Sequence, residues 1–111
     1  MTLHETLLRD LKRIGIDVDS MTLAVRPYHS RYHGRYLFDV SKIFVYIYVD
    51  KTKHKQRTYE EVLETAIHEA THHMISRERT VTRGETHNNE FKERYGRYMK
   101  SALKLGLIKG R

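Results

Sequence analysis

The chain has 111 residues, which suits one domain with a modest core, and its 39% hydrophobic and 32% charged residues exclude a disordered or fibrous protein. It has no cysteine, so disulfides and cysteine-based zinc sites are excluded, and any metal must be bound by histidine or carboxylate side chains. The formal net charge of +7 favours association with nucleic acid or acidic surfaces. The longest apolar run, Ile43–Val49, is far shorter than the roughly 18 residues of a membrane span. The N-terminus also lacks the apolar segment of a signal peptide, so we expect a cytoplasmic protein without membrane contact.

Residues 2–50 predict one helix and three short strands. Apolar residues recur at helical spacing from Thr2 to about Ile14, and Gly15 ends the stripe. Three later segments have the composition of strands: Met21–Arg26, Arg35–Phe38 and Lys42–Asp50. The last of these has β-branched and aromatic residues on both faces, which predicts an interior strand or one covered on both sides.

Two further helices are predicted after the strands. A basic loop over residues 51–57 precedes Thr58 and Glu61, whose spacing is that of a capping box, and the helix that follows should end near residue 76. A charged turn comes next, and the last helix runs from about His87 to Leu105. The order of helix, sheet, helix and helix predicts a single α+β domain over residues 1–111, with a small mixed or antiparallel sheet of about three strands.

The first of these two helices contains the sequence H-E-A-T-H. His68 and His72 are four residues apart, so on a helix they point the same way from adjacent turns and can bind one ion. Glu69 is rotated by about 100° from His68 and flanks the ligands, where a general base for a metal-activated water belongs. The residue frequencies of this chain give roughly one chance in twenty of an accidental match, so the motif alone does not decide.

The apolar residues of this helix predict which way the histidines face. One arc is apolar and is formed by Tyr59, Val62, Leu63, Ala66, Ile67, Ala70 and Met74. His68 and His72 fall outside this arc, which argues against two packed core histidines and leaves a solvated helix face as the alternative to a metal site. His73 lies on the apolar arc, so we expect it either to be packed or to support the metal ligands from behind, and not to share an ion with the other two.

His87 is the predicted third ligand. A catalytic zinc usually has three protein ligands and leaves its fourth position to water. His87 lies four residues before Phe91, so it continues the apolar stripe of the last helix and should point toward H-E-A-T-H. That stripe consists of Phe91, Tyr95, Tyr98, Ala102 and Leu105.

Other third ligands are less well supported by the sequence than His87. The metzincin pattern is absent, because Ile75 and Glu78 occupy the positions where it requires glycine and histidine. A carboxylate ligand is the alternative to His87, and Glu85, Glu90 and Glu93 are the candidates for it.

H-E-A-T-H followed by T-H-N-N-E-F (Thr86–Phe91) resembles the SprT-like family of zincin metallopeptidases, in which a third histidine follows in an H-x-x-x-F context. The resemblance covers roughly residues 42–108. It implies a minimal zincin-like fold, one Zn²⁺ bound by His68, His72 and His87, and acid–base catalysis by Glu69. Two features depart from the family: Asn88 stands where glycine is frequent, and the cysteine-based zinc ribbon of many members is missing. The family's accessory DNA-binding parts therefore do not carry over.

The resemblance and the motif together predict a zinc metallopeptidase that hydrolyses a protein or peptide substrate, including proteins associated with nucleic acid. Zinc would activate a water molecule, and Glu69 would take its proton and pass it to the leaving amine. Tyr95 and Arg83 are candidates for stabilising the oxyanion by chain position only; the plainer interpretation is a core tyrosine and a solvated arginine.

The alternative function is a basic nucleic-acid-binding module with a structural or vestigial metal site. The segment Arg26–Tyr36 interleaves basic and aromatic residues, which would suit base stacking and phosphate contacts, although Pro27 and Gly34 favour a solvated loop that leads into a strand. His29 and His33 in this segment are a weaker candidate for a second metal site. The charge run at residues 51–57 is expected to be solvated.

Overall fold

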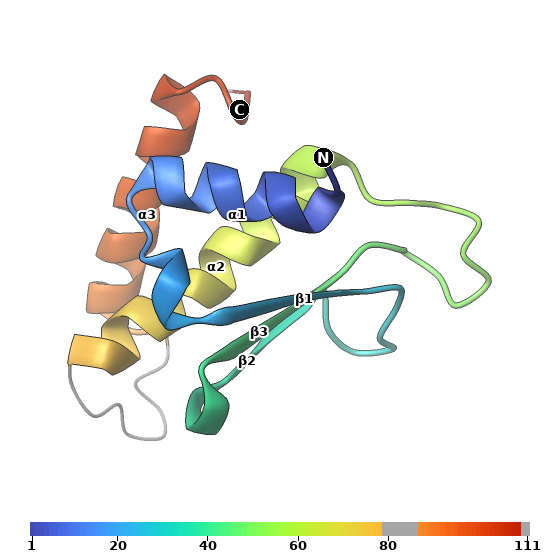
Figure 1. The fold of residues 1–111 in the computed structure, drawn as a ribbon, viewed down its shortest axis with the longest axis horizontal. Coiled ribbons are helices and arrows are strands. Elements are labelled where there is room, and N and C mark those ends of the chain that lie inside the picture. Colours follow the sequence, from blue (N-terminus) through green and yellow to red (C-terminus); the bar gives the residue numbers. More distant parts are fainter. Residues whose placement is uncertain (79–86, 110–111) are drawn as a thin grey trace.

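Three helices and a three-stranded sheet form two layers (Figure 1), and the computed structural model describes residues 1–78 and 87–109. The helices are α1 (Leu3–Ile14), α2 (Tyr59–Glu78) and α3 (Asn89–Lys104), and the strands are β1 (Thr22–Arg26), β2 (Gly34–Leu37) and β3 (Lys42–Tyr46). The predicted α+β class is confirmed. None of the described helices is long and apolar enough to cross a membrane.

The helix α1 forms where the apolar stripe predicted it. The Thr2 hydroxyl accepts a hydrogen bond from the Glu5 backbone N–H at 3.1 Å, and the Glu5 carboxylate accepts one from the Thr2 backbone N–H at 3.2 Å. This capping box satisfies amide groups that have no partner in the first turn. The helix ends at Gly15, whose φ of 110° is in the left-handed region that favours glycine.

The sheet has the strand order β1-β3-β2 and is mixed. The central strand β3 pairs parallel with β1 and antiparallel with β2, so the interior strand predicted from two-sided hydrophobicity is confirmed. It ends at Tyr46 and not at Asp50, because its neighbours end there. On one side Pro27 has no N–H to extend β1, and on the other β2 begins only at Gly34, opposite Val45.

Helices cover one face of the sheet (Figure 1). Both α1 and α2 contact the sheet, and α3 packs against these two helices. The core lies between the layers; among its most buried side chains are Leu7 and Leu11 of α1, Ile43 and Val45 of β3, and Leu63 and Ile67 of α2. No described helix lies on the opposite face of the sheet.

The helix α2 begins at the predicted capping box, in which the Glu61 backbone N–H donates to the Thr58 hydroxyl at 3.2 Å and the Glu61 carboxylate accepts from the Thr58 N–H at 3.1 Å. It continues to Glu78, so the predicted end near residue 76 is two residues short. Burial extends well beyond the predicted apolar arc, because α3 and β2 flank α2 on two further sides. His72, predicted to lie outside the core arc, is only 9% exposed for this reason.

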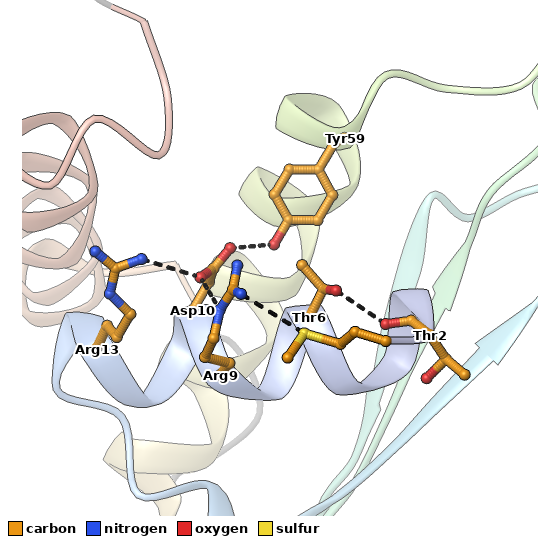
Figure 2. A network of polar contacts seen from close by, with 7 residues as sticks. Thr2, Thr6, Arg9, Asp10, Arg13 and Tyr59 are labelled. Carbon is orange, nitrogen blue, oxygen red and sulfur yellow. Dashed lines mark hydrogen bonds and ion pairs between the residues drawn. The ribbon is translucent and has the colours of Figure 1, made fainter.

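A polar contact also joins α1 to the start of α2 (Figure 2). Tyr59 donates a hydrogen bond of 2.5 Å to the buried Asp10 carboxylate, which also pairs with Arg9 at 3.1 Å and Arg13 at 3.5 Å. Burial of Asp10 favours its neutral form, but the hydrogen bonds from Tyr59 and Arg9 and the two arginine charges outweigh burial and lower its pKa. The contact thus anchors α2 to α1 through an ionised carboxylate.

The start of α3 differs from the prediction. Asn88 is the N-cap, and its side-chain oxygen accepts a hydrogen bond from the Phe91 backbone N–H at 3.1 Å. His87 therefore precedes the helix and does not lie on its first turn. At the other end the helix stops at Lys104, so Leu105 leaves the predicted apolar stripe and is 40% exposed.

Candidate metal centre

Three histidine rings converge beside the middle of α2. His68 and His72 come from adjacent turns of that helix, and His87 reaches them from the segment that precedes α3. One nitrogen from each ring lies within 4.8 Å of the other two, and the Nε2 atoms of His68 and His87 are 3.2 Å apart. The three side chains are thus close enough to bind one metal ion.

The ring of Phe91 packs against all three histidine rings. Its own ring, 4% exposed, lies 4.9 Å from His68, 4.5 Å from His72 and 5.0 Å from His87 between centroids. The Asn88 cap bonds to the Phe91 backbone, so the same short segment sets both His87 and its aromatic support.

The chemistry of this donor set fits zinc. In a tetrahedral site with Zn–N bonds of about 2.0–2.1 Å, two ligand nitrogens are separated by about 3.3 Å, close to the spacing of His68 and His87. Burial lowers the pKa of His68, and the charge of His87 lowers it further. Burial, followed by the charges of His68 and His87, lowers the pKa of His72 to about 4. These two rings are therefore neutral at pH 7, with lone pairs available to a metal.

Glu69 lies beside the histidines on α2. Its carboxylate oxygen Oε2 is 4.0 Å from Nε2 of His68, and the residue is 9% exposed. Burial raises the pKa of Glu69 to about 7 in the metal-free protein. A buried carboxylate with a raised pKa holds a proton more readily than an exposed one, which suits a group that must accept a proton and return it.

A cleft of about 560 Å³ opens over the histidines and Glu69. One wall comes from α2 and includes Glu64 and Thr65, and Tyr95 of α3 adds to the lining. The other wall is formed by residues 31–36, the end of the loop before β2 and the strand itself. The sequence favoured a solvated loop for most of this segment, and no local pattern marked it as a wall of the site.

Gly34 brings that wall against α2. A Cβ atom at this position would lie 2.4 Å from the Thr65 Cγ2 atom and 3.2 Å from the Glu69 Cγ atom. The first distance is shorter than real Cβ contacts and the second is tight, so any larger residue would force Thr65 or the strand to move. The sequence placed Gly34 at a strand entry but did not reveal this contact.

The other predicted site residues are distributed as follows. Within the described residues, His68, His72 and His87 are the group of histidines and carboxylates that could share an ion; Glu90 and Glu93 do not belong to it. Glu85, the third carboxylate alternative, and Arg83 lie outside the described residues. His73 is 1% exposed, so its predicted packed position is confirmed.

Tyr95 and His29 take up positions that the sequence left open. The Tyr95 ring stacks on Phe91 with centroids 5.9 Å apart, and the residue lines the cleft as well as packing against the core. Among the described residues, His29 and His33 belong to no group of three or more side chains that could share an ion, and the His29 ring packs against Tyr32 and Tyr46. The arrangement leaves a single candidate centre among the described residues.

Comparisons with protein-family models, with curated proteins and with solved structures find no match for this chain. Its function is therefore inferred from the chemistry of the site.

Proposed function

We propose that the protein is a zinc-dependent metallopeptidase, with His68, His72 and His87 as metal ligands and Glu69 as the general base. The observation that carries this proposal is the convergence of three imidazole nitrogens beside a buried carboxylate at the floor of an open cleft. Three protein ligands leave a fourth position for water, as in catalytic and not in closed structural zinc sites. The resemblance of the two motifs to the SprT-like family supports the same function.

The reaction follows from the positions of these groups. Zinc, when bound, supplies a Lewis acid that lowers the pKa of water toward about 7. Glu69 accepts the proton of the attacking water at its carboxylate and returns it to the amine that leaves when the peptide bond breaks. Because Glu69 is on the same helix as two of the ligands, its distance from them is set by the helix itself.

The proposed substrate is an extended protein or peptide segment. The strand β2 is an edge strand of the sheet and forms one wall of the cleft, so its outer backbone groups can pair with a substrate strand. Such pairing depends on backbone atoms, which suits a peptidase that accepts many sequences.

Replacing Glu69 by glutamine tests the proposal. Glu69→Gln should keep one zinc per chain while cleavage of an unfolded protein falls by at least about a hundredfold, because the general base is lost and the ligands are not. Glu64→Gln is the matched control, since Glu64 also lies on α2 and lines the cleft. Cleavage that persists in Glu69→Gln would remove Glu69 from the mechanism, and absence of bound zinc in the wild-type protein would refute the metallopeptidase.

A second candidate function is favoured by the open face of the sheet, where cations lie against aromatic rings. The Lys42 ammonium is 5.1 Å and the Arg26 guanidinium 5.9 Å from the centroid of Phe44, and the Arg35 guanidinium is 5.7 Å from that of Tyr32. None of the three strands carries an acidic residue. Rings for base stacking beside cations for phosphates would suit single-stranded nucleic acid, in a module whose metal site is structural or vestigial.

Charge reversal distinguishes this second function from general attraction by a basic protein. Binding of a fluorescent single-stranded oligonucleotide can be measured by anisotropy at two salt concentrations. The Kd of Lys42→Glu should be about ten times higher than the Kd of Lys100→Glu. Lys100 is an exposed lysine of α3, away from the sheet. Equal losses in the two variants would mean that net charge and not this face attracts the oligonucleotide.

A further inference from the structure

The imidazole of His73 is a buried polar group that the proposed chemistry does not use. It lies on α2 next to the proposed ligand His72, and it does not belong to the group of three histidines that could share an ion. Its Nε2 atom is 2.8 Å from the Ser20 hydroxyl, and its Nδ1 atom is 2.9 Å from the Tyr36 hydroxyl. Ser20 ends a short 3-10 helix (Val18–Ser20) that precedes β1, and Tyr36 is in β2, so one ring joins α2 to two other elements.

Both ring nitrogens of His73 are used in directional contacts. A neutral imidazole carries one N–H and one lone pair, so in either tautomer it donates to one of the two hydroxyls and accepts from the other. The contacts continue outward: the Tyr36 hydroxyl is 2.9 Å from that of Ser76, and Ser20 Oγ donates to the Asp17 carbonyl oxygen at 2.8 Å. Because Ser20 has a single hydroxyl hydrogen, the bond to Asp17 favours the tautomer in which Nε2–H of His73 donates to Ser20 and Nδ1 accepts from Tyr36. The ring orientation is therefore fixed from both sides.

These contacts lie on the same face of α2 as the proposed general base. Thr65, Glu69 and His73 are spaced four residues apart and so form a row along the helix. The strand β2 follows this row: Gly34 lies against Thr65 and Glu69, and Tyr36, two residues later on the same side of the strand, bonds to His73. Glu69 is thus held between a close backbone contact and a hydrogen bond.

Apolar packing constrains the rotation of a helix about its axis less sharply than hydrogen bonds do. The core contacts of α2 include the small side chains Ala66 and Ala70 beside the larger Val62, Leu63 and Ile67, and apolar burial is not directional in itself. Side-chain atoms lie about 5–6 Å from a helix axis, so a rotation of 10° moves them by about 1 Å. A displacement of that size is larger than the tolerance of about 0.5 Å for a catalytic arrangement.

We infer that His73 is a positioning residue, which through Tyr36 and Ser20 sets the rotation of α2 and so the direction in which His68, His72 and Glu69 face the cleft. This inference rests on the proposed metal site. It assigns His73 no contact with metal or substrate. The hydrogen bonds, which are directional where apolar packing is not, supply the orientation.

Two hydroxyl deletions test the inference, with a third as the matched control. Tyr36→Phe and Ser20→Ala each remove one partner of the His73 ring. Tyr59→Phe removes a phenol hydroxyl that bonds to a buried partner, Asp10, at the other end of α2. The measurement is cobalt binding to the purified proteins, read from the visible absorption bands, because their position and intensity report coordination geometry.

We expect Tyr36→Phe and Ser20→Ala to raise the Kd for cobalt by about tenfold and to alter the absorption bands. Tenfold is the lower end of the loss in metal affinity that is typical when a residue that orients the ligands is changed. Tyr59→Phe should lower thermal stability to a similar degree and leave both readouts unchanged. If Tyr36→Phe and Ser20→Ala bind cobalt with the same Kd and the same absorption bands as Tyr59→Phe, the hydrogen bonds of His73 stabilise the fold only, and the positioning role is overturned.

The metal-free proteins give a readout that does not depend on the metal site. If the wild-type protein binds no cobalt, the proposed function fails, and imidazole ¹⁵N–¹H correlation spectra decide the positioning role by themselves. The positioning role is supported if the signals of His68 and His72 shift in Tyr36→Phe and Ser20→Ala and do not shift in Tyr59→Phe. Signals that shift in all three variants, or in none, overturn it.

Discussion

Replacing Gly34 by alanine tests how closely β2 must approach α2. The backbone of Gly34 does not have a positive φ, so space and not conformation excludes a side chain. The added Cβ atom would lie 2.4 Å from Thr65 Cγ2 and 3.0 Å from the Phe44 carbonyl oxygen. Carbon atoms pack best at about 3.5–4.0 Å, so strand and helix must separate by about 1 Å or Thr65 must move.

The expected cost follows from two opposing effects. Overpacking by a methyl group typically costs about 1–3 kcal/mol, whereas alanine gains about 0.5–1 kcal/mol over glycine within a strand. Gly34→Ala should therefore lower the free energy of unfolding by about 1–2 kcal/mol. For a domain of this length, such a loss lowers the Tm by roughly 5–10 °C.

Thermal unfolding of four proteins, followed by circular dichroism, measures this effect: wild type, Gly34→Ala, Thr65→Ser and the double variant. Thr65→Ser deletes the Cγ2 methyl that the new Cβ atom would meet, so the double variant should recover at least half of the lost stability. A Gly34→Ala protein that melts at or above the wild-type temperature would refute the reasoning. The reasoning would also be refuted if Thr65→Ser lowered the stability of the Gly34→Ala protein by the same amount as it lowers that of the wild type.

Three further predictions concern the metal, an ionised carboxylate and an exposed helix position. Zinc at about 100 times its Kd should stabilise the protein by about 2.7 kcal/mol, and His87→Ala should abolish the rise in Tm; an equal rise in both would contradict the three-histidine site. Because the pKa of Asp10 is lowered in the fold, its stabilisation is present above its ordinary pKa of about 4 and is lost as pH falls below it. Urea unfolding of Asp10→Asn should therefore depend less on pH in that range than unfolding of the wild type, and an unchanged dependence would exclude Asp10. Gly96→Ala in α3 should raise the free energy of unfolding by about 0.5–1 kcal/mol, since its Cβ atom would meet nothing within 4 Å; a lower Tm would contradict this.

Local patterns predicted the helices and the central strand well. The apolar stripe that ends at Gly15 predicted α1, and the capping box at Thr58 predicted the start of α2, because both patterns depend on residues close together in the sequence. The approach of His87 to the other histidines was expected from its spacing to Phe91, although the helix begins after His87. Asn88 is a better N-cap than histidine, and this decides where α3 starts.

Contacts between distant segments were the part that the sequence could not provide. The burial of His72 depends on two neighbours of α2 that no helical periodicity records. The wall formed by residues 31–36 and the close contact at Gly34 depend on how β2 is placed by its pairing with β3. The partners of His73 were likewise out of reach, since Ser20 and Tyr36 lie 53 and 37 residues away along the chain.

The segment of α2 from Val62 to Ser76 has no exposed residue, and this has a consequence for how the protein can vary. One side of the helix packs in the core, a second carries the histidines and Glu69, and a third lies against β2. In a deep mutational scan, the stretch from Thr65 to Ser76 should therefore tolerate few substitutions, and variants lost through misfolding will be mixed with variants lost through inactivity. Substitutions should be tolerated at exposed positions of α3 such as Lys92, Glu93 and Lys100. Surface charge can therefore vary more readily in this protein than the residues of the proposed site.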